Sequence, residues 1–161
     1  METACIALGS NLGNRRENLR LAVERIGSLD GVEVKAASDF FITAPVDSPE
    51  NSPEFLNAAV VVETRLSADD LLQGLLEIEQ QLGRRRSVVR NAPRTIDLDL
   101  LLHGDSVIRT PTLELPHPRM HTRRFVLEPL AQISPDLRHP ELHRSIRELL
   151  EDLLRANDSP R

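Results

Sequence analysis

Residues 95–102 read Thr-Ile-Asp-Leu-Asp-Leu-Leu-Leu and alternate between polar and apolar side chains over their first six positions. Side chains on a β-strand point alternately to opposite faces. Ile96, Leu98 and Leu100 would therefore share one face and pack in the core. Asp97 and Asp99 would lie next to each other on the opposite face. The stretch predicts a strand that is buried on one side and carries two carboxylates on the other.

The preceding part of the chain supplies partners for this strand. Short apolar stretches rich in β-branched residues predict strands over residues 4–8, 32–42 and 57–64. Apolar residues three or four positions apart predict helices over residues 15–28 and 67–82. The resulting order, β-α-β-β-α-β, is typical of the ferredoxin-like α+β fold, in which helices pack on an antiparallel sheet.

A C-terminal extension follows this core. We expect a turn at residues 103–105, after which Val107 and Ile108 pair back as a short hairpin strand. Residues 113–130 are interrupted by prolines, so mostly loop with one short helix is predicted there.

The end of the chain has a simple pattern. Apolar spacing predicts a last amphipathic helix over residues 145–154. A disordered tail is expected over about residues 156–161. Since no repeat, low-complexity segment or linker occurs, residues 1–161 are predicted to form a single domain.

The charge of the chain is distributed unevenly. Apolar residues make up 40% and charged residues 28%, and the net charge of −5 argues against general nucleic-acid binding. Residues 84–124, however, contain nine arginines and only four acids. A basic patch on an acidic body suits a compact anion better than a long polyanion.

The sequence also bears on location. Cys5 is the single cysteine, so no disulfide can form within the chain, and this fits a reducing compartment. The first residues lack the basic and apolar regions of a signal peptide. The longest apolar runs, residues 58–62 and 100–102, are too short to span a bilayer. We therefore expect a cytoplasmic protein without a membrane partner.

The Asp97–Asp99 pair is the sharpest sign of chemistry. Two adjacent carboxylates repel each other unless a cation lies between them, and oxygen ligands suit Mg²⁺. Arg94 precedes the strand and Arg84 opens the basic segment that leads to it. A metal surrounded by arginines is typical of phosphoryl transfer. The plainer alternative is a solvent-facing strand with two acids.

Two further signals concern ligands. Near a triphosphate, His117 and Arg123 would donate hydrogen bonds to phosphate oxygens, although a solvated basic loop explains them equally well. Zinc binding by His117 and His121 is discounted because the surrounding motif is missing. Phe55 and Phe125 lie in polar surroundings and would stack a flat ligand. The glycine-rich turn at residues 9–13 lacks the P-loop spacing and receives no phosphate role.

Four ordered motifs show a resemblance to a known family. They are Ala7-Leu8-Gly9-Ser10-Asn11-Leu12-Gly13, Phe55-Leu56-Asn57-Ala58-Ala59, Pro93-Arg94-Thr95-Ile96-Asp97-Leu98-Asp99 and Leu115-Pro116-His117-Pro118-Arg119. Together they resemble the 6-hydroxymethyl-7,8-dihydropterin pyrophosphokinase family of folate biosynthesis. The resemblance runs from about Thr3 to about Leu154 and is most specific at residues 93–99.

The resemblance implies a reaction and its site. The reaction would move the β,γ-diphosphate of ATP to the hydroxymethyl oxygen of the pterin and release AMP. By the same match Asp97 and Asp99 would bind two Mg²⁺ ions, and Arg84 and Arg94 would assist catalysis. The ATP-binding positions would be Glu79, which this match places near the ribose, and Arg84, Arg94, His117 and Arg123. The pterin-binding positions would be Thr43, Ala44, Pro45, Val46, Phe55, Asn57, Asp97 and Phe125.

Four positions depart from the family pattern, and one of them is Phe55, which replaces a frequent tyrosine and keeps the stacking surface without the hydroxyl. Ala44 replaces a frequent proline, and Asn91 stands where an aromatic residue is frequent. Pro118 occupies a position where some members place a tyrosine on the nucleotide, so no contact is expected from it. The long segments 43–53 and 84–92 are candidates for lids that close over ATP.

Two other functions remain open from the sequence. One is a small-molecule kinase that releases ADP through the same metal chemistry. The other is a non-catalytic ferredoxin-like module that binds a nucleotide. If the protein is a pyrophosphokinase, as the resemblance implies, its partners are ATP and the pterin, and we expect neither nucleic acid nor an obligate protein partner.

Overall fold

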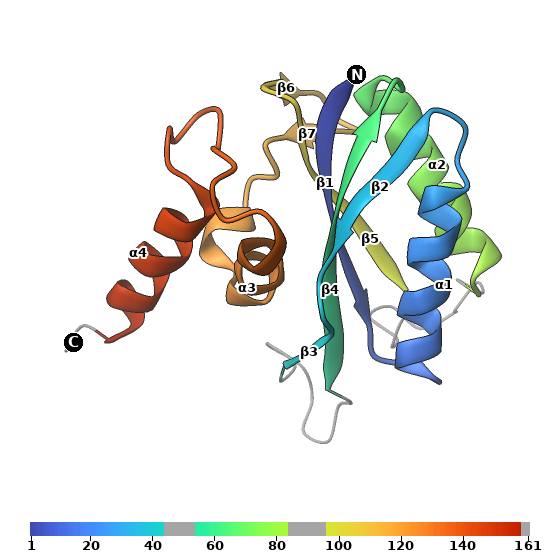
Figure 1. Ribbon diagram of the computed structural model, residues 1–161, viewed down its shortest axis with the longest axis horizontal. Coiled ribbons are helices and arrows are strands. Elements are labelled where there is room, and N and C mark those ends of the chain that lie inside the picture. The colour runs from blue at the N-terminus through green and yellow to red at the C-terminus, as the bar shows by residue number, and fades with distance from the viewer. Residues whose placement is uncertain (44–53, 84–95, 159–161) are drawn as a thin grey trace.

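The structure is a computed structural model that describes residues 1–43, 54–83 and 96–158. It has a mixed α+β fold in which helices pack on both faces of an antiparallel sheet (Figure 1). The strands are β1 (Glu2–Ser10), β2 (Val32–Ala37), β3 (Phe41–Thr43), β4 (Phe55–Thr64), β5 (Asp97–His103), β6 (Ile108–Arg109) and β7 (Glu114–Leu115). The helices are α1 (Arg15–Gly27), α2 (Ala68–Gln81), the 3₁₀ helix η1 (Met120–Thr122), α3 (Arg124–Ile133) and α4 (Ile146–Asp158).

Long strands give the main sheet its register. The strand order is β2-β4-β1-β5, and β3 pairs with the start of β4. The central strands β1 and β4 pair without interruption from Glu2 opposite Thr64 to Ser10 opposite Leu56. Strand β5 pairs with β1 alone among the described strands, so it forms an edge of the sheet.

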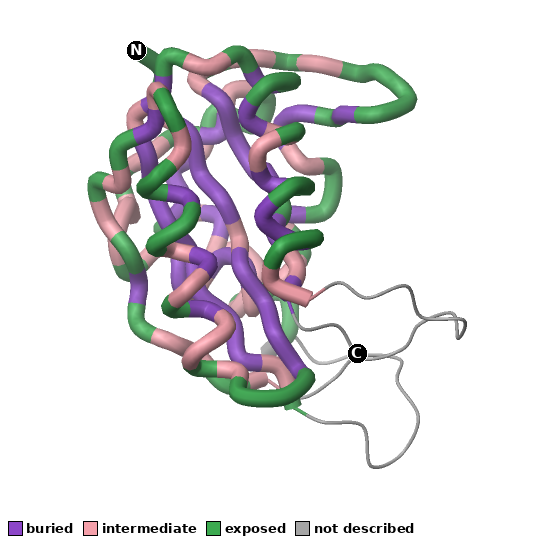
Figure 2. The backbone as a smooth tube through the Cα atoms, turned by 90° about the vertical axis from the view of Figure 1, so that its right-hand side faces the viewer, coloured by how far each residue is buried: buried purple, intermediate pink, exposed green. Residues whose placement is uncertain are grey.

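Two hydrophobic clusters lie on opposite faces of this sheet. Helices α1 and α2 cover one face, and α3 and α4 lie on the other (Figure 1). The first cluster includes Leu98 and Leu100 of β5 together with Leu71 and Leu75 of α2. The second joins β-strand residues to α3 and α4 and includes Leu127. Strands β1, β4 and β5 are accordingly buried along most of their length between the helices, whereas β2 and β3 are more exposed (Figure 2).

The predicted strand over residues 32–42 is wrong as a single element. It is divided into β2 and β3 because Ser38 replaces part of the ladder with its own hydrogen bonds. The Ser38 backbone N–H donates to the Ala59 carbonyl at 2.9 Å, and the Ala59 N–H donates to the Ser38 hydroxyl oxygen at 2.9 Å. The Asp39 N–H then donates to Gln132 of α3 at 2.7 Å, which directs the chain out of β2.

The C-terminal extension contains two other differences. Ile108 does not pair back on β5, because β6 pairs with β7 in a separate two-stranded sheet. A single α-helix does interrupt the predicted loop, but α3 continues through Pro129 to Ile133. Helix α4 extends to Asp158, so the prediction of disorder is wrong for residues 156–158.

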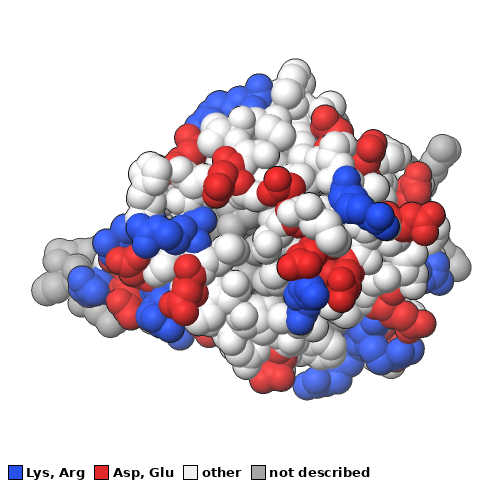
Figure 3. All heavy atoms as spheres, turned by 45° about the horizontal axis from the view of Figure 1, so that its top comes forward, with Lys and Arg blue, Asp and Glu red and all other residues white. Residues whose placement is uncertain are grey.

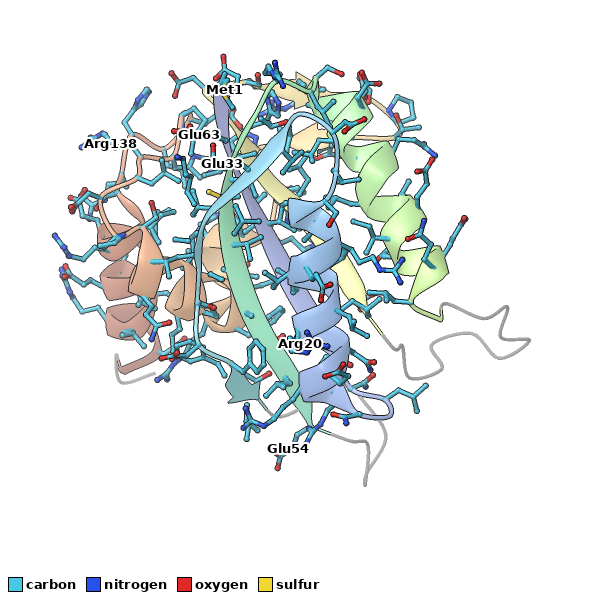
Figure 4. All side chains as sticks on the ribbon, turned by 45° about the vertical axis from the view of Figure 1, so that its right-hand side comes forward. Met1, Arg20, Glu33, Glu54, Glu63 and Arg138 are labelled. Carbon is cyan, nitrogen blue, oxygen red and sulfur yellow. The ribbon has the colours of Figure 1, made fainter. Side chains whose placement is uncertain are left out.

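The surface mixes both signs of charge. Acidic and basic side chains are interspersed on the face drawn in Figure 3. Glu33 and Glu63 stand opposite each other on β2 and β4, near Met1 in Figure 4, and Lys35 lies 3.3 Å and 3.8 Å from their carboxylates. Within the described ranges, no helix has the length and apolar character needed to cross a membrane.

Adjacent leucines on α2 provide a test of the core. Leu75 is fully buried between α2 and the sheet, whereas Leu76 is 37% exposed. We expect Leu75→Ala to lower the free energy of unfolding by about 2–5 kcal/mol, because it leaves a cavity in the first cluster. The matched change Leu76→Ala should cost far less, as measured by urea unfolding. Equal losses in the two variants would contradict this packing.

Candidate functional site

The floor of the candidate site is a row of cross-strand neighbours. Gly9 of β1 stands between Asn57 of β4 and Asp97 of β5 in the register of the sheet. In the next row of the same face, Ala7 stands beside Asp99. The middle strand contributes at most a methyl group at these positions, whereas Asn57, Asp97 and Asp99 beside it have larger side chains. The register thus forms a shallow trough with carboxylates along one side and an amide along the other.

A cavity of about 540 Å³ lies over this trough. Its second wall comes from the segment where η1 meets α3, so the ligand space lies between the sheet and the C-terminal extension. The predicted site residues that line it are Thr43, Phe55, Asn57, Asp97, Asp99, Arg123 and Phe125. These residues come from four separate parts of the chain, and the fold brings them to one space.

Other predicted residues lie elsewhere. Glu79 lines neither this cavity nor the second one described below. The predictions for Ala44, Pro45, Val46, Arg84 and Arg94, and the two candidate lids beyond Thr43 and Gly83, lie outside the described residues.

Alternation along β5 separates the two roles of this strand. Ile96, Leu98 and Leu100 are buried in the first hydrophobic cluster. Asp97 and Asp99 both line the cavity on the opposite face. The geometry expected for the carboxylate pair is therefore present, and the two side chains face the same space.

Hydrogen bonds fix the wall that β4 contributes. The Asn57 amide nitrogen donates to the Thr43 hydroxyl at 2.5 Å, which orients the amide and joins β3 to β4 inside the cavity. Glu54 lies just before β4, at the lower end of that strand in Figure 4. The Arg15 guanidinium donates to the Glu54 carbonyl at 2.6 Å. That contact anchors the residue next to Phe55 to the start of α1.

The opposite wall combines an aromatic ring with a cation. The guanidinium carbon of Arg123 lies 5.6 Å from the centre of the Phe125 ring. Such a distance is within the range of a cation–π interaction, which orients the guanidinium over the ring. This wall can therefore offer both a stacking surface and a positive charge to a ligand.

His117 borders a second cavity of about 290 Å³, which also includes Asp99, Leu72, Leu100, Thr112 and Pro118. Asp99 is thus common to both cavities.

The Arg119 N–H donates to His117 Nδ1 at 3.2 Å, so the neutral ring carries its proton on Nε2. Burial lowers the pKa of His117, although Asp99 opposes this, and nearby Arg123 and Arg119 lower it further. His117 is accordingly a neutral hydrogen-bond donor near pH 7.

Glu79 of α2 is buried beneath β5 and not in a cavity wall. Its Oε2 accepts a hydrogen bond from the Leu98 backbone N–H at 2.9 Å. The link joins α2 to the peptide that lies between the two aspartates.

Sequence reasoning missed several cavity residues, of which Gly9 is the most informative. A Cβ atom at Gly9 would lie 3.3 Å from Asn57 Oδ1 and 3.7 Å from the Phe55 ring. The glycine-rich motif at residues 7–13 was a signal for this position, but no ligand contact was predicted from it. The other residues missed were Ala7, Leu8, Thr122 and Arg124. Pro118, from which no contact was expected, lines the second cavity.

The donor set bears on which cation the site fits. Among the described residues, no three His, Cys, Asp or Glu side chains are grouped to hold a metal by themselves. Two cavity-facing carboxylates fit Mg²⁺, which prefers oxygen ligands and completes its shell with water and substrate phosphates. A metal here would therefore be shared between Asp97, Asp99 and a phosphate-bearing ligand.

Comparison with known proteins now gives the family. Residues 5–135 match the family of 7,8-dihydro-6-hydroxymethylpterin-pyrophosphokinase (HPPK). The 2-amino-4-hydroxy-6-hydroxymethyldihydropteridine pyrophosphokinase of Bacillus subtilis (strain 168) is 47% identical over 130 residues, which are 81% of this chain and 77% of that protein.

Longer proteins contain a similar segment. The folic acid synthesis protein fol1 of Schizosaccharomyces pombe is 37% identical over 93% of this chain, which spans 20% of that protein. The fold is similar to a crystal structure of HPPK-DHPS in complex with substrates, with a TM-score of 0.72 and 13% identity, over 98% of this chain and 44% of that one.

The family match covers most of the chain, and the bacterial relative is aligned over most of its own length. The chain described here belongs to the 7,8-dihydro-6-hydroxymethylpterin-pyrophosphokinase family.

Proposed function

We propose that the protein transfers the β,γ-diphosphate of ATP to the hydroxymethyl oxygen of 6-hydroxymethyl-7,8-dihydropterin and releases AMP, with the trough over β1 as its active site. The observation that carries this assignment is the shared cavity of the carboxylate pair, the two phenylalanines and Asn57. A flat polar ring, its reactive alcohol and a metal-bound phosphate chain need these three kinds of group in one space.

The pterin would occupy the cavity between sheet and extension. Phe55 and Phe125 stand on different walls and would stack the ring, since aromatic faces favour offset stacking. Asn57, oriented by Thr43, would read the hydrogen-bonding edge of the ring. Burying a polar edge against a fixed amide gives selectivity, because a ring lacking the matching groups would leave that amide unpaired.

ATP would lie across the two cavities. The second cavity includes the apolar side chains of Leu72 and Leu100, against which a base would pack, and Asp99 joins it to the pterin space. The Nε2–H group of His117 would donate a hydrogen bond to a phosphate oxygen, and Arg123 would place its charge beside the phosphate chain. The resemblance adds Arg84 and Arg94 as further phosphate ligands. This arrangement would hold the attacking oxygen and the phosphate near each other before reaction.

Asp97 and Asp99 would hold two Mg²⁺ ions in the working enzyme. When bound, such ions neutralise phosphate charge and lower the pKa of a coordinated hydroxyl. The chain's own contribution is to keep both carboxylates on the cavity side of a strand whose other side is locked in the core.

The products decide between the proposed activity and its alternatives. The protein is incubated with Mg-ATP and the hydroxymethyl pterin, and both products are weighed by mass spectrometry. AMP with a pterin diphosphate is the expected result. ADP with a pterin monophosphate would establish the kinase alternative, and ATP binding without turnover would establish the nucleotide-binding module.

Removing either carboxylate tests the metal assignment. Loss of a group that only supports a metal ligand already costs 10–100-fold, so we expect Asp97→Asn and Asp99→Asn each to reduce kcat/KM at least about a hundredfold. Circular dichroism should show an intact fold. Asp105→Asn is the matched control, because Asp105 is exposed in the turn after β5. Wild-type turnover and Mg²⁺ dependence in both cavity variants would refute the assignment.

The glycine floor gives a separate test of the pterin position. Gly9→Ala would place a methyl group 3.3 Å from Asn57 Oδ1. Overpacking of about 1–3 kcal/mol should raise the KM for the pterin roughly tenfold or more, with less effect on the KM for ATP. Gly27→Ala is the control, since its Cβ would contact Val34 at 3.4 Å in another part of the molecule. An unchanged pterin KM in Gly9→Ala would place the substrate elsewhere.

Several finer assignments stay predictions. We class the sheet with its helices α1 and α2 as a ferredoxin-like core, and the strand order β2-β4-β1-β5 supports this. The extent of the domain over residues 1–161, the cytoplasmic location and the action without an obligate protein partner are also proposals.

A further inference from the structure

The position of β5 at the sheet edge creates a backbone problem. Its one described partner strand is β1, so alternate N–H groups along β5 point away from the sheet. Leu98 pairs in register with Leu8, yet its N–H donates to α2 and not to β1. This peptide lies between Asp97 and Asp99, where any shift of the strand would move both carboxylates.

Glu79 of α2 accepts the hydrogen bond from this Leu98 N–H. The residue is only 4% exposed, and its Oε2 lies 2.9 Å from the Leu98 nitrogen. Burying a carboxylate is costly unless it is hydrogen-bonded, so an apolar residue would be the simpler choice for filling this space. A buried acid that bonds the peptide between two catalytic acids has a reason beyond packing.

We propose that Glu79 is a positioning residue, which fixes the β5 backbone so that Asp97 and Asp99 keep the spacing needed to share a divalent cation. This proposal rests on the proposed function and deepens it. Glu79 acts through the Leu98 peptide and needs no contact with either substrate. It differs in this from the role near the ATP ribose that the family resemblance implies.

The first measurement is metal affinity without turnover. Mn²⁺ replaces Mg²⁺ as a spectroscopic probe, and its binding is followed by electron paramagnetic resonance with α,β-methylene-ATP present. Loss of outer-shell support typically weakens metal binding 10–100-fold, and we expect Glu79→Leu to raise the Mn²⁺ dissociation constant by this factor. Glu79→Gln should recover most of the affinity, because its amide oxygen still accepts the Leu98 N–H.

Controls separate this role from general destabilisation. Glu77→Leu removes an acid from an exposed position of the same helix and should leave Mn²⁺ binding as in the wild type. Hydrogen exchange at the Leu98 amide should speed up in Glu79→Leu and remain slow in Glu79→Gln. If Glu79→Leu does not fold, Glu79→Ala takes its place in the comparison.

Nucleotide analogues separate positioning from ribose contact. The KM values for ATP and for 2′-deoxy- and 3′-deoxy-ATP are compared in wild type and Glu79→Leu. Positioning predicts that removing a ribose hydroxyl changes KM by the same factor in both proteins. A deoxy penalty that vanishes in Glu79→Leu would establish ribose contact and overturn the proposal.

Failure of this proposal is distinguishable from failure of the proposed function. Wild-type protein that forms AMP and pterin diphosphate, together with unchanged Mn²⁺ affinity in Glu79→Leu, would reject positioning and leave the function standing. Absence of pterin turnover in the wild type would reject the function, whereas the Mn²⁺ comparison would still report on Glu79.

Discussion

The alternation of apolar and acidic side chains along β5 is the constraint on which the rest of this site depends. Asp97 and Asp99 face one cavity, and their charges oppose close approach. The strand stays in place because Leu98 and Leu100 anchor its other side in the core. The buried face therefore fixes which side chains of β5 point into the cavity. A shift of one residue in register would exchange the faces and place both acids in the core.

The cavity has two walls of different origin. One wall belongs to the sheet, where the continuous pairing of β1 and β4 fixes the positions of Gly9 and Asn57. The other belongs to the C-terminal extension, where the start of α3 presents Arg123 and Phe125. Helix α3 packs on the sheet through the second hydrophobic cluster. The width of the ligand space thus depends on core packing far along the helix as well as on the residues in the walls.

Local patterns predicted the parts of the molecule that have local causes. The period-two alternation of residues 95–102 predicted which side chains of β5 face the core and which face the cavity. Helical spacing predicted α1 and α2 to within about a residue at most ends. The antiparallel sheet with packed helices followed from the order of these elements. These features depend on neighbours within a few positions, which a sequence displays directly.

Features that depend on distant partners could not be predicted in this way. The break between β2 and β3 needs Ala59 and Gln132, which are remote in sequence from Ser38. The pairing of β6 with β7 depends on the course of the extension after β5. Gly9 gains its place in the cavity floor from the register of three strands. The hydrogen bond between Glu79 and Leu98 likewise joins a helix to a strand 19 residues later, and no local sequence pattern indicates that pairing.

The edge position of β5 has a further consequence for the behaviour of the protein in solution. Exposed strand edges are templates for pairing with another chain, and proteins blunt them with charge or with a covering element. Here Glu79 of α2 accepts the outward N–H of Leu98, and the Leu101 carbonyl accepts a hydrogen bond from the His117 N–H of the C-terminal extension at 2.9 Å. A second copy approaching this edge would meet both obstacles. The backbone contacts that hold β5 in place therefore also reduce the length of strand edge that is left for pairing with another chain.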